Sequence, residues 1–389
     1  MTRTALAALV VALLATGCSG ESSSGTSTAA SATATTASVN STIVPAESWQ
    51  ISTPEEQGMS SGTLAGLFDE IVDQRYRIDS VLVVRNGRIV ADAAVPGYED
   101  DSLHIVHSVT KSIVSTLIGI AIEDGHLDGV DQPVLDIFAD REIANVDARK
   151  ERMTVEHLLT MTTGFDCRDS YLHSWEGLGD LRSSHDWIQH VLDLPMIAEP
   201  GEQFEYCNSA SFLLSAIIQE VTGKTADEFA QDRLFGPIGV TGYHWPANPD
   251  GISIGWGELL IAPRDLARFG LLILDEGRWH GEQVVPEAWI YDATTPHIDG
   301  TLQNGYGYQW WIRDDGIIEA LGYKGQYVIV DRRRNLVVVS VSDLPDEGFF
   351  IPDDLFDRHV IPSVVSDDPP PPDPAGRDAM ADAVARWRP

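Results

Sequence analysis

Lysine is the scarcest charged residue in this 389-residue chain, which contains only Lys111, Lys150, Lys224 and Lys324. Lysine and arginine together number 26 against 59 aspartates and glutamates, so the formal net charge is −33. Because so acidic a surface repels phosphate groups, nucleic acid is excluded as an expected partner. The acidity instead indicates a surface adapted for solubility or for a salty medium.

Cysteine is also rare, and the apolar run near the start is short. Residues 5–15 are apolar without interruption, and residues 14–18, Leu-Ala-Thr-Gly-Cys, resemble a bacterial lipobox. A membrane-spanning helix needs about 20 apolar residues, whereas a signal peptide needs fewer. We therefore expect a lipoprotein signal peptide over residues 1–17, a lipid on Cys18, and export to the outer face of a bacterial cell membrane. The alternative is an ordinary secretory signal with a chance cysteine.

Two further segments have compositions that disfavour a packed core. Residues 18–46 are rich in serine, threonine, alanine and glycine, which predicts a flexible tether between the membrane and the body. Residues 366–389 form an acidic tail in which residues 369–372 are all proline, a sequence that favours an extended chain. We expect a short, loose helix over residues 377–387.

The two remaining cysteines are Cys167 and Cys207. An exported protein meets an oxidising environment, in which they can form a disulfide. The alternative is a pair of buried thiols, because the sequence does not give the distance between their Cα atoms.

The body between these ends has strand patterns at both ends and helix patterns in the middle. The predicted strands are residues 81–84, 89–93, 306–312, 326–330 and 336–341. The predicted helices are residues 64–72, 108–124, 155–161, 185–192, 210–222, 225–235, 263–274 and 355–364. We expect an α+β fold, in which an antiparallel sheet built from both ends is flanked by helices. The α/β part then comprises residues 47–140 and 249–365, with a helical subdomain over residues 141–248 inserted in it.

The first chemical motif is Ser108-x-x-Lys111, at the start of an unusually apolar helix. Residues three apart lie on one helix face, so the Lys111 amine can reach the Ser108 hydroxyl. A lysine that is desolvated can lose its proton and activate a serine nucleophile. The helix N-terminus also supplies free N–H groups that suit a developing oxyanion. The alternative is that Ser108 only caps the helix and Lys111 is solvated.

The second motif is Tyr206-x-Asn208, which follows a Pro-Gly turn and precedes a predicted helix. Alternate residues of an extended stretch point the same way, so both side chains can face one cleft. A phenol beside a lysine can relay a proton, and an amide can orient the lysine and a substrate carbonyl. The alternative is that Tyr206 belongs to the core and Asn208 caps the helix.

The third motif is Gly322-Tyr323-Lys324-Gly325-Gln326, directly before a strongly β-type run. A glycine at a strand edge lets a substrate approach the backbone, and the Gln326 N–H can serve an oxyanion. The alternative is a tight turn before a strand.

In this order the three motifs resemble the superfamily of class C β-lactamases, penicillin-binding proteins and family VIII esterases. Residues 158–164, 265–272 and 306–311 are similar to relatives of 6-aminohexanoate-dimer hydrolase, and the likeness covers residues 53–364. The resemblance implies a β-lactamase/transpeptidase-like fold and a serine hydrolase without cofactor or metal. The implied substrate is a small ester, amide or peptide.

The resemblance also implies a role for each motif residue. Ser108 is then the acylated nucleophile and Lys111 its base, while Tyr206 passes protons to the leaving group and to the deacylating water. Asn208 supports Lys111 and the substrate, and the N–H groups of Ser108 and Gln326 form the oxyanion hole.

One departure from the family pattern concerns the third motif, which in lactamases and peptidases begins with lysine. Here Tyr323 holds that place, and Lys324 is the second residue rather than the motif lysine. The group that would bind a substrate carboxylate is therefore in doubt, which favours a carboxylesterase or an amidase like 6-aminohexanoate-dimer hydrolase. The alternatives are a D-amino-acid peptidase, a β-lactamase, or a non-catalytic lipoprotein that binds peptidoglycan or a partner.

Other motifs are weaker. Gly251-x-Ser253-x-Gly255 matches the nucleophile elbow of α/β-hydrolases, but loop-type residues precede it where a strand is required. The substrate pocket is expected in the loops over residues 171–187 and 255–258. Three tryptophans there have either a cleft or a core role: Trp175, Trp187 and Trp256.

Overall fold

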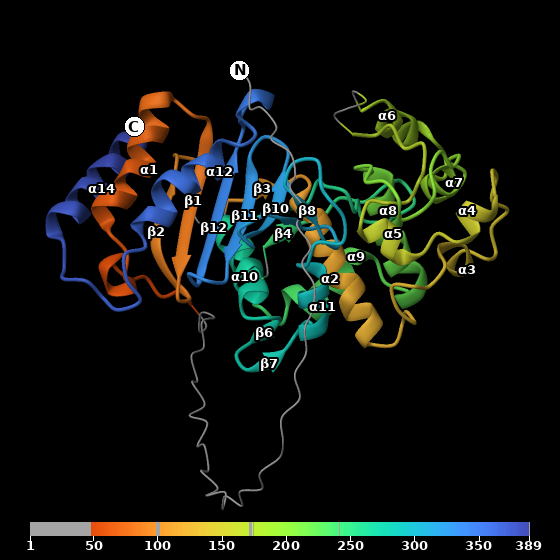
Figure 1. Ribbon diagram of the computed structural model, residues 1–389, viewed down its shortest axis with the longest axis horizontal. Helices are drawn as coiled ribbons and strands as arrows, with labels where there is room; N and C mark the ends of the chain where they lie inside the picture. The colour runs from red at the N-terminus through yellow and green to blue at the C-terminus, as the bar shows by residue number, and fades with distance from the viewer. Residues whose placement is uncertain (1–47, 99–101, 171–172, 174, 241, 389) are drawn as a thin grey trace, which may run out of the picture. The chain divides into compact units, whose positions relative to one another are not determined.

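A computed structural model describes residues 48–98, 102–170, 173, 175–240 and 242–388 (Figure 1). The expected signal peptide, Cys18 and the tether lie outside the described residues. Within the described part, no helix is both long enough and apolar enough to cross a bilayer.

A seven-stranded antiparallel sheet joins the two ends of the body, as the sequence predicts. Its order is β2-β1-β12-β11-β10-β9-β8, so the first hairpin lies beside the strands that end the body. The turn between β1 and β2 is Asn86-Gly87, with φ of 51° and 73°, which is the backbone that this dipeptide favours. The strands are β1 Ile78–Arg85, β2 Arg88–Ala94, β8 Gly305–Tyr306, β9 Trp311–Ile312, β10 Ile318–Gly322, β11 Gln326–Asp331 and β12 Leu336–Ser342.

Three helices position the sheet and the site. Helix α10, Pro263–Leu274, packs on β1, β11 and β12, and a Cβ added at Gly270 would lie 2.6 Å from Val337. Helix α2, Val109–Glu123, is buried almost all round, because its apolar residues cover every face. It contacts β10 and β11 on one side and α8, Asn208–Thr222, on the other (Figure 1). Helix α2 therefore lies between the sheet and the helical region.

The chain between α2 and α10 is mainly helical. Its helices are α3 Val134–Ile137, α4 Ala148–Glu151, α5 Val155–Leu159, α6 Glu176–Ser183, α7 Trp187–Leu192, α8, α9 Ala226–Ala230 and the π-helix η3 Gln231–Phe235. Helix α8 ends at Gly223 with φ of 70°, the left-handed conformation that stops a helix. The helix predicted over residues 225–235 is thus an α-helix that continues as a π-helix.

Five short strands and the remaining helices complete the described chain. The strands are β3 His104–Ile105, β4 Tyr243–His244, β5 Leu260–Ile261, β6 Arg278–Trp279 and β7 Glu282–Gln283. The helices are η1 Glu55–Gln57, α1 Ser61–Gln74, α11 Glu287–Ala293, η4 Asp346–Gly348, α12 Ile351–Leu355, η5 Phe356–Val360, α13 Ile361–Ser363 and α14 Pro374–Trp387. The helix predicted over residues 355–364 is accordingly divided into short α and π segments.

The continuous strand predicted over residues 306–312 is wrong, because the chain turns between β8 and β9. Gln309 lies in this turn with φ of 62°. Its backbone and side-chain N–H groups donate to the Leu159 carbonyl, and its side-chain oxygen accepts from Ser211. Its own carbonyl accepts from Ser112 on α2. The buried Gln309 thus connects the sheet edge to α2, α5 and α8. These hydrogen bonds require a turn at Gln309, although the neighbouring apolar residues favour a strand.

The C-terminal helix is not loose, contrary to the expectation for residues 377–387. Helix α14 runs alongside α1 over its length (Figure 1). The Trp387 ring lies 5.8 Å from the Phe68 ring and is 7% exposed, and Ala383 is fully buried. Alanine and tryptophan on one helix face bury enough apolar surface to hold the helix in place.

Candidate active site

Ser108 and Lys111 lie at the start of α2 and are in contact. Ser108 occupies the position before the first residue of the helix, and its side chain makes no capping hydrogen bond. Lys111 is 1% exposed, and its Nζ lies 3.1 Å from the Ser108 Oγ. The structure therefore contradicts both alternatives: Ser108 is not a side-chain cap, and Lys111 is not solvated.

The Lys111 amine is held by two carbonyl oxygens besides the serine. Its Nζ donates to Asn208 Oδ1 at 2.7 Å and to the Trp256 carbonyl at 2.7 Å. Neither carbonyl can donate a proton, so two N–H bonds of the amine point at these oxygens. When the third proton is lost, the lone pair is directed at the Ser108 hydroxyl. This arrangement suits a general base.

Burial supplies the second requirement for that base. Removal from water disfavours the ammonium form and lowers the pKa of Lys111 to about 7, although the nearby Asp169 carboxylate opposes the shift. A neutral amine is then abundant near neutral pH. His107, directly before Ser108, is also desolvated, and its pKa falls to about 4, so its ring is neutral there.

Asp169 holds Asn208 in place, although no sequence motif marks this residue. Its carboxylate accepts from the backbone N–H of Asn208 at 2.8 Å and of Ser209 at 2.6 Å, at the N-terminus of α8. Its carbonyl accepts from the Asn208 side-chain amide at 2.5 Å. A carboxylate at this end of a helix is favoured by the exposed N–H groups. Asn208 is 2% exposed and reaches Lys111, so it lies behind the amine rather than on the cleft wall.

A disulfide joins Cys167 to Cys207, one of the two states that the sequence allowed. Cys167 lies two residues before Asp169, and Cys207 directly precedes Asn208. The covalent bond therefore fastens the segment that carries Asp169 to the end of α8. The disulfide thereby supports the contacts that hold the Lys111 amine.

Tyr206 lies beside this group and faces the cleft. Its ring is stacked on Trp311 with centroids 6.0 Å apart, and the Lys111 Nζ lies 4.8 Å from its ring centroid. Tyr206 and Ser108 line the same cleft. The expectation that alternate residues would share one cleft holds for Tyr206 and not for Asn208, because the helix begins at Asn208.

The third motif forms the turn between β10 and β11. Gly325 has φ of 86°, and a Cβ there would lie 2.4 Å from the Ser342 Oγ. The turn and its packing on β12 therefore both require glycine at this position. The Gln326 side chain donates to the Ser342 carbonyl at 2.5 Å, so it joins strands rather than facing the substrate. Lys324 pairs with Asp343 at 2.5 Å.

Gly322, at the end of β10, lets this strand approach the backbone of another segment closely. A Cβ at Gly322 would lie 2.4 Å from the Val106 carbonyl, two residues before Ser108. Strand β10 and the turn that follows it can therefore lie against the segment that carries the serine. The His107 and Tyr323 rings are 5.7 Å apart across this junction.

The cleft at Ser108 has a volume of 620 Å³ and a largely aromatic wall. Its aromatic lining residues are Trp175, Tyr206, Trp311, Tyr323, Phe349 and Phe350. Its other lining residues are Ser108, Thr301, Leu302, Leu321 and Asp346. Sequence reasoning found Trp175 but missed five wall residues that no motif marks, namely Thr301, Leu302, Asp346, Phe349 and Phe350. Trp187 and Trp256 instead stack on each other in the core, with centroids 5.6 Å apart.

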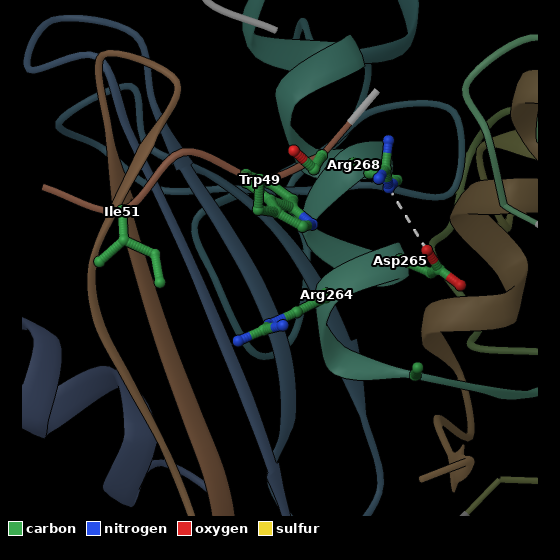
Figure 2. Close-up of a pocket in the computed structure, with 7 residues that line it drawn as sticks. Trp49, Ile51, Arg264, Asp265 and Arg268 are labelled. Atoms are coloured by element: carbon green, nitrogen blue, oxygen red, sulfur yellow. Dashed lines mark ion pairs between the residues drawn. The ribbon is translucent and has the colours of Figure 1, made fainter. Parts of the chain in front are cut away.

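A second cavity, of 290 Å³, lies on α10 (Figure 2). Arg268 lies 3.4 Å from Asp265 there, and Arg264 pairs with Asp92 at 2.6 Å. Trp49 lies against the Arg268 guanidinium, 5.6 Å from the ring centroid. The arginines of this cavity are already paired with carboxylates.

Two other groupings of reactive side chains occur in the described part of the chain, one around Ser253 and one around the disulfide. Ser253 of the Gly-x-Ser-x-Gly segment is 1% exposed, and its hydroxyl accepts from the Asp227 backbone N–H in a loop rather than at a strand-to-helix turn. Cys167, Asp169 and Cys207 place three ligand-type atoms close together. Both sulfur atoms are used by the disulfide, so this group does not offer thiolates.

Several known proteins are similar to this chain in sequence or in structure. A model of the Beta-lactamase family matches residues 64–360. The chain is 25% identical over 322 residues to 6-aminohexanoate-dimer hydrolase of Paenarthrobacter ureafaciens, covering 76% of this chain and 80% of that protein. A Bacillus anthracis protein assigned as a 6-aminohexanoate-dimer hydrolase has a similar structure, with a TM-score of 0.67, 21% identity, and coverage of 83% and 90%. EstCE1, a hydrolase with promiscuous acyltransferase activity, gives a TM-score of 0.64, 18% identity, and coverage of 79% and 99%.

Proposed function

The chain belongs to the Beta-lactamase family and is a serine hydrolase, and from this premise we propose that it cleaves a carboxylic ester or amide through an acyl-enzyme on Ser108. The observation that carries the proposal is the buried Lys111 amine, 3.1 Å from the Ser108 Oγ and fixed by two carbonyl acceptors. A serine beside such a base becomes a nucleophile near neutral pH.

The geometry supports a definite sequence of steps. Lys111 takes the Ser108 proton as the Oγ bonds to the substrate carbonyl carbon. The oxyanion is stabilised by the backbone N–H groups of Ser108 and Gln326, and such donors contribute about 10²–10³ in rate. Tyr206 then delivers its phenol proton to the leaving oxygen or nitrogen as the bond from that atom to the carbonyl carbon breaks, and it takes up in exchange the proton that Lys111 removed from Ser108. A water molecule attacks the acyl-enzyme through the same groups, which releases the carboxylic acid and restores the Ser108 hydroxyl.

The cleft wall favours a carboxylesterase or an amidase like 6-aminohexanoate-dimer hydrolase over a β-lactamase or a D-amino-acid peptidase. The place that a lysine holds in lactamases and peptidases is occupied by Tyr323, whose hydroxyl donates to Asp346 at 2.7 Å. Lys324 does not line the cleft and is paired with Asp343. A substrate carboxylate would thus meet the Asp346 carboxylate and the Tyr323 phenol, whose proton is already donated to Asp346.

We expect a fluorophosphonate to add once to the full chain in detergent solution and benzylpenicillin to add weakly or not at all. Intact-mass spectrometry measures both adducts, and Ser108→Ala is the control. Folded protein that takes up neither reagent would refute the proposal, and rapid penicillin labelling at Ser108 would favour the penicillin-binding alternative.

We further propose that the protein is exported and that a lipid on Cys18 holds it at the outer face of the bacterial cell membrane. The lipobox-like residues 14–18 support this proposal. Cys18→Ser is expected to abolish palmitate incorporation and to move the protein from the membrane fraction to the soluble fraction of a bacterial host. Unchanged fractionation and labelling would contradict the anchor while leaving the catalytic proposal intact.

A further inference from the structure

The described residues that line the cleft at Ser108 carry little charge. Among the described residues that line it, Asp346 is the single side chain with a formal charge. Six of the eleven lining residues are aromatic, and none is an arginine, lysine or histidine. Lys111 lies behind the serine, and desolvation lowers its pKa to about 7. The wall thus offers one carboxylate among aromatic faces.

Asp346 is connected through Tyr323 to His107, the residue directly before the catalytic serine. The Tyr323 hydroxyl donates to Asp346 Oδ1 at 2.7 Å, and its ring meets that of His107, the neighbour of Ser108, at 5.7 Å. The Trp175 ring lies 5.9 Å from the Tyr323 ring on the cleft wall. A substrate group that reaches Asp346 would therefore lie beside the Tyr323 and Trp175 rings, in the same cleft as Ser108.

The hydrogen-bond direction decides which charge this wall accepts. The only proton of the Tyr323 phenol is given to Asp346, so it is not available to a substrate carboxylate. An anionic substrate would meet the Asp346 charge, and none of the described residues that line the cleft is an arginine, lysine or histidine. An ammonium group would instead find a carboxylate together with aromatic faces, the combination that recognises cations in proteins. The chain's net charge of −33 acts in the same direction on the approach of a cation.

We propose that Asp346 makes the enzyme selective for esters or amides that carry an ammonium group, primary or quaternary, near the scissile bond. This inference rests on the proposed function, because it assigns a substrate class to the same cleft. Asp346 binds the charged group, and the aromatic wall covers the adjoining hydrocarbon. Glu347 is the neighbouring exposed carboxylate and does not line the cleft, so it provides a matched control.

The test uses two methylphosphonate thioesters that differ only in their leaving groups, thiocholine and its uncharged isostere 3,3-dimethylbutanethiol. In both reactions the Ser108 Oγ bonds to phosphorus, the phosphorus–sulfur bond breaks, and the serine proton leaves with the thiol. The adduct is identical, so intact mass gives two comparable rate constants. Because the thiols differ in intrinsic reactivity, the cationic-to-neutral rate ratio is compared between variants of the full chain in detergent.

Asp346→Asn is expected to lower this ratio about fivefold, the upper range for a partly solvated charge pair, while Glu347→Gln leaves it unchanged. Asp346→Lys is expected to lower it further. The ratio should fall more steeply with added salt in the unaltered protein than in Asp346→Asn, because the remaining negative charge of the chain acts on both proteins alike. If the ratio is the same in Asp346→Asn as in the unaltered protein, the inference is wrong and the hydrolase proposal stands. If neither probe labels Ser108, the proposed function fails, and the inference fails with it.

Discussion

Lys111→Met is expected to lower kcat/KM for a cleaved ester by about 10⁴-fold or more, and Ser108→Ala by a similar factor. The two groups act as one unit, because the amine has no catalytic use without the serine and the serine is a poor nucleophile without the amine. The double variant should therefore be no worse than either single variant. Steady-state kinetics on the three proteins measures this, and losses that multiply would show that the two groups act separately.

The control for Lys111→Met is another lysine that is equally buried. Lys150 is fully buried and donates to the Ala144 carbonyl at 3.0 Å and the Leu192 carbonyl at 2.6 Å, but it has no nucleophile beside it. Lys150→Met also leaves buried carbonyls without a donor and should cost about 1–3 kcal/mol of stability. It should leave kcat unchanged. A similar loss of kcat in both variants would indicate damage to folding rather than to chemistry.

The same lysine sets the sign of the pH dependence. Desolvation disfavours the ammonium form and lowers the pKa of Lys111 to about 7, so the amine is neutral above this pH and protonated below it. Only the neutral amine can accept the Ser108 proton. We therefore expect kcat/KM to fall about tenfold for each pH unit below about 7 and to be level above it, because one proton titrates. A profile that still rises toward pH 10 would show that Lys111 keeps its ordinary pKa and is not the base.

Local sequence patterns sufficed for the parts of the site that depend on one element. Ser108 and Lys111 are three residues apart on a helix, so their contact follows from helix geometry alone. The apolar character of α2 also indicated that the lysine would be buried. The hairpins β1-β2 and β11-β12 were predictable from strand patterns on either side of a short turn, because antiparallel strands can be joined by a tight turn.

The parts that sequence reasoning missed depend on contacts across the fold. The Trp256 carbonyl holds Lys111 through its backbone, so the residue type carries no signal for that role. Asp169 is one of many acids, and only its position at the end of α8 distinguishes it. Gln309 sits in a run of aromatic residues that looks like a strand, yet its side chain is used by helices distant in sequence. The cleft residues Phe349 and Phe350 follow the last strand, where no periodic pattern fixes their direction.

Removal of the disulfide is expected to have the largest effect on stability. Cys167 and Cys207 are separated by 40 residues, and the entropy of closing a loop of that size corresponds to about 4 kcal/mol. Both cysteines are almost fully buried, so alanine is the appropriate replacement and introduces no new polar group. We expect the Cys167→Ala, Cys207→Ala double variant to lose about this much free energy of unfolding in urea.

The position of the bond predicts a loss of activity as well, even under conditions where the variant is folded. Without the bond, the segment bearing Asp169 can separate from the N-terminus of α8, so Asn208 loses the contacts that direct its oxygen at Lys111. The amine would then move relative to the Ser108 hydroxyl, which lowers kcat more than it raises KM, because most of the cleft residues come from segments distant from the disulfide. Asp169→Asn, which keeps the disulfide and weakens the same contacts, should lower kcat with a smaller loss of stability. A double-cysteine variant with full kcat would show that Asp169 and α8 hold the lysine without covalent help, and an unchanged free energy of unfolding would show that the loop is already constrained in the unfolded chain.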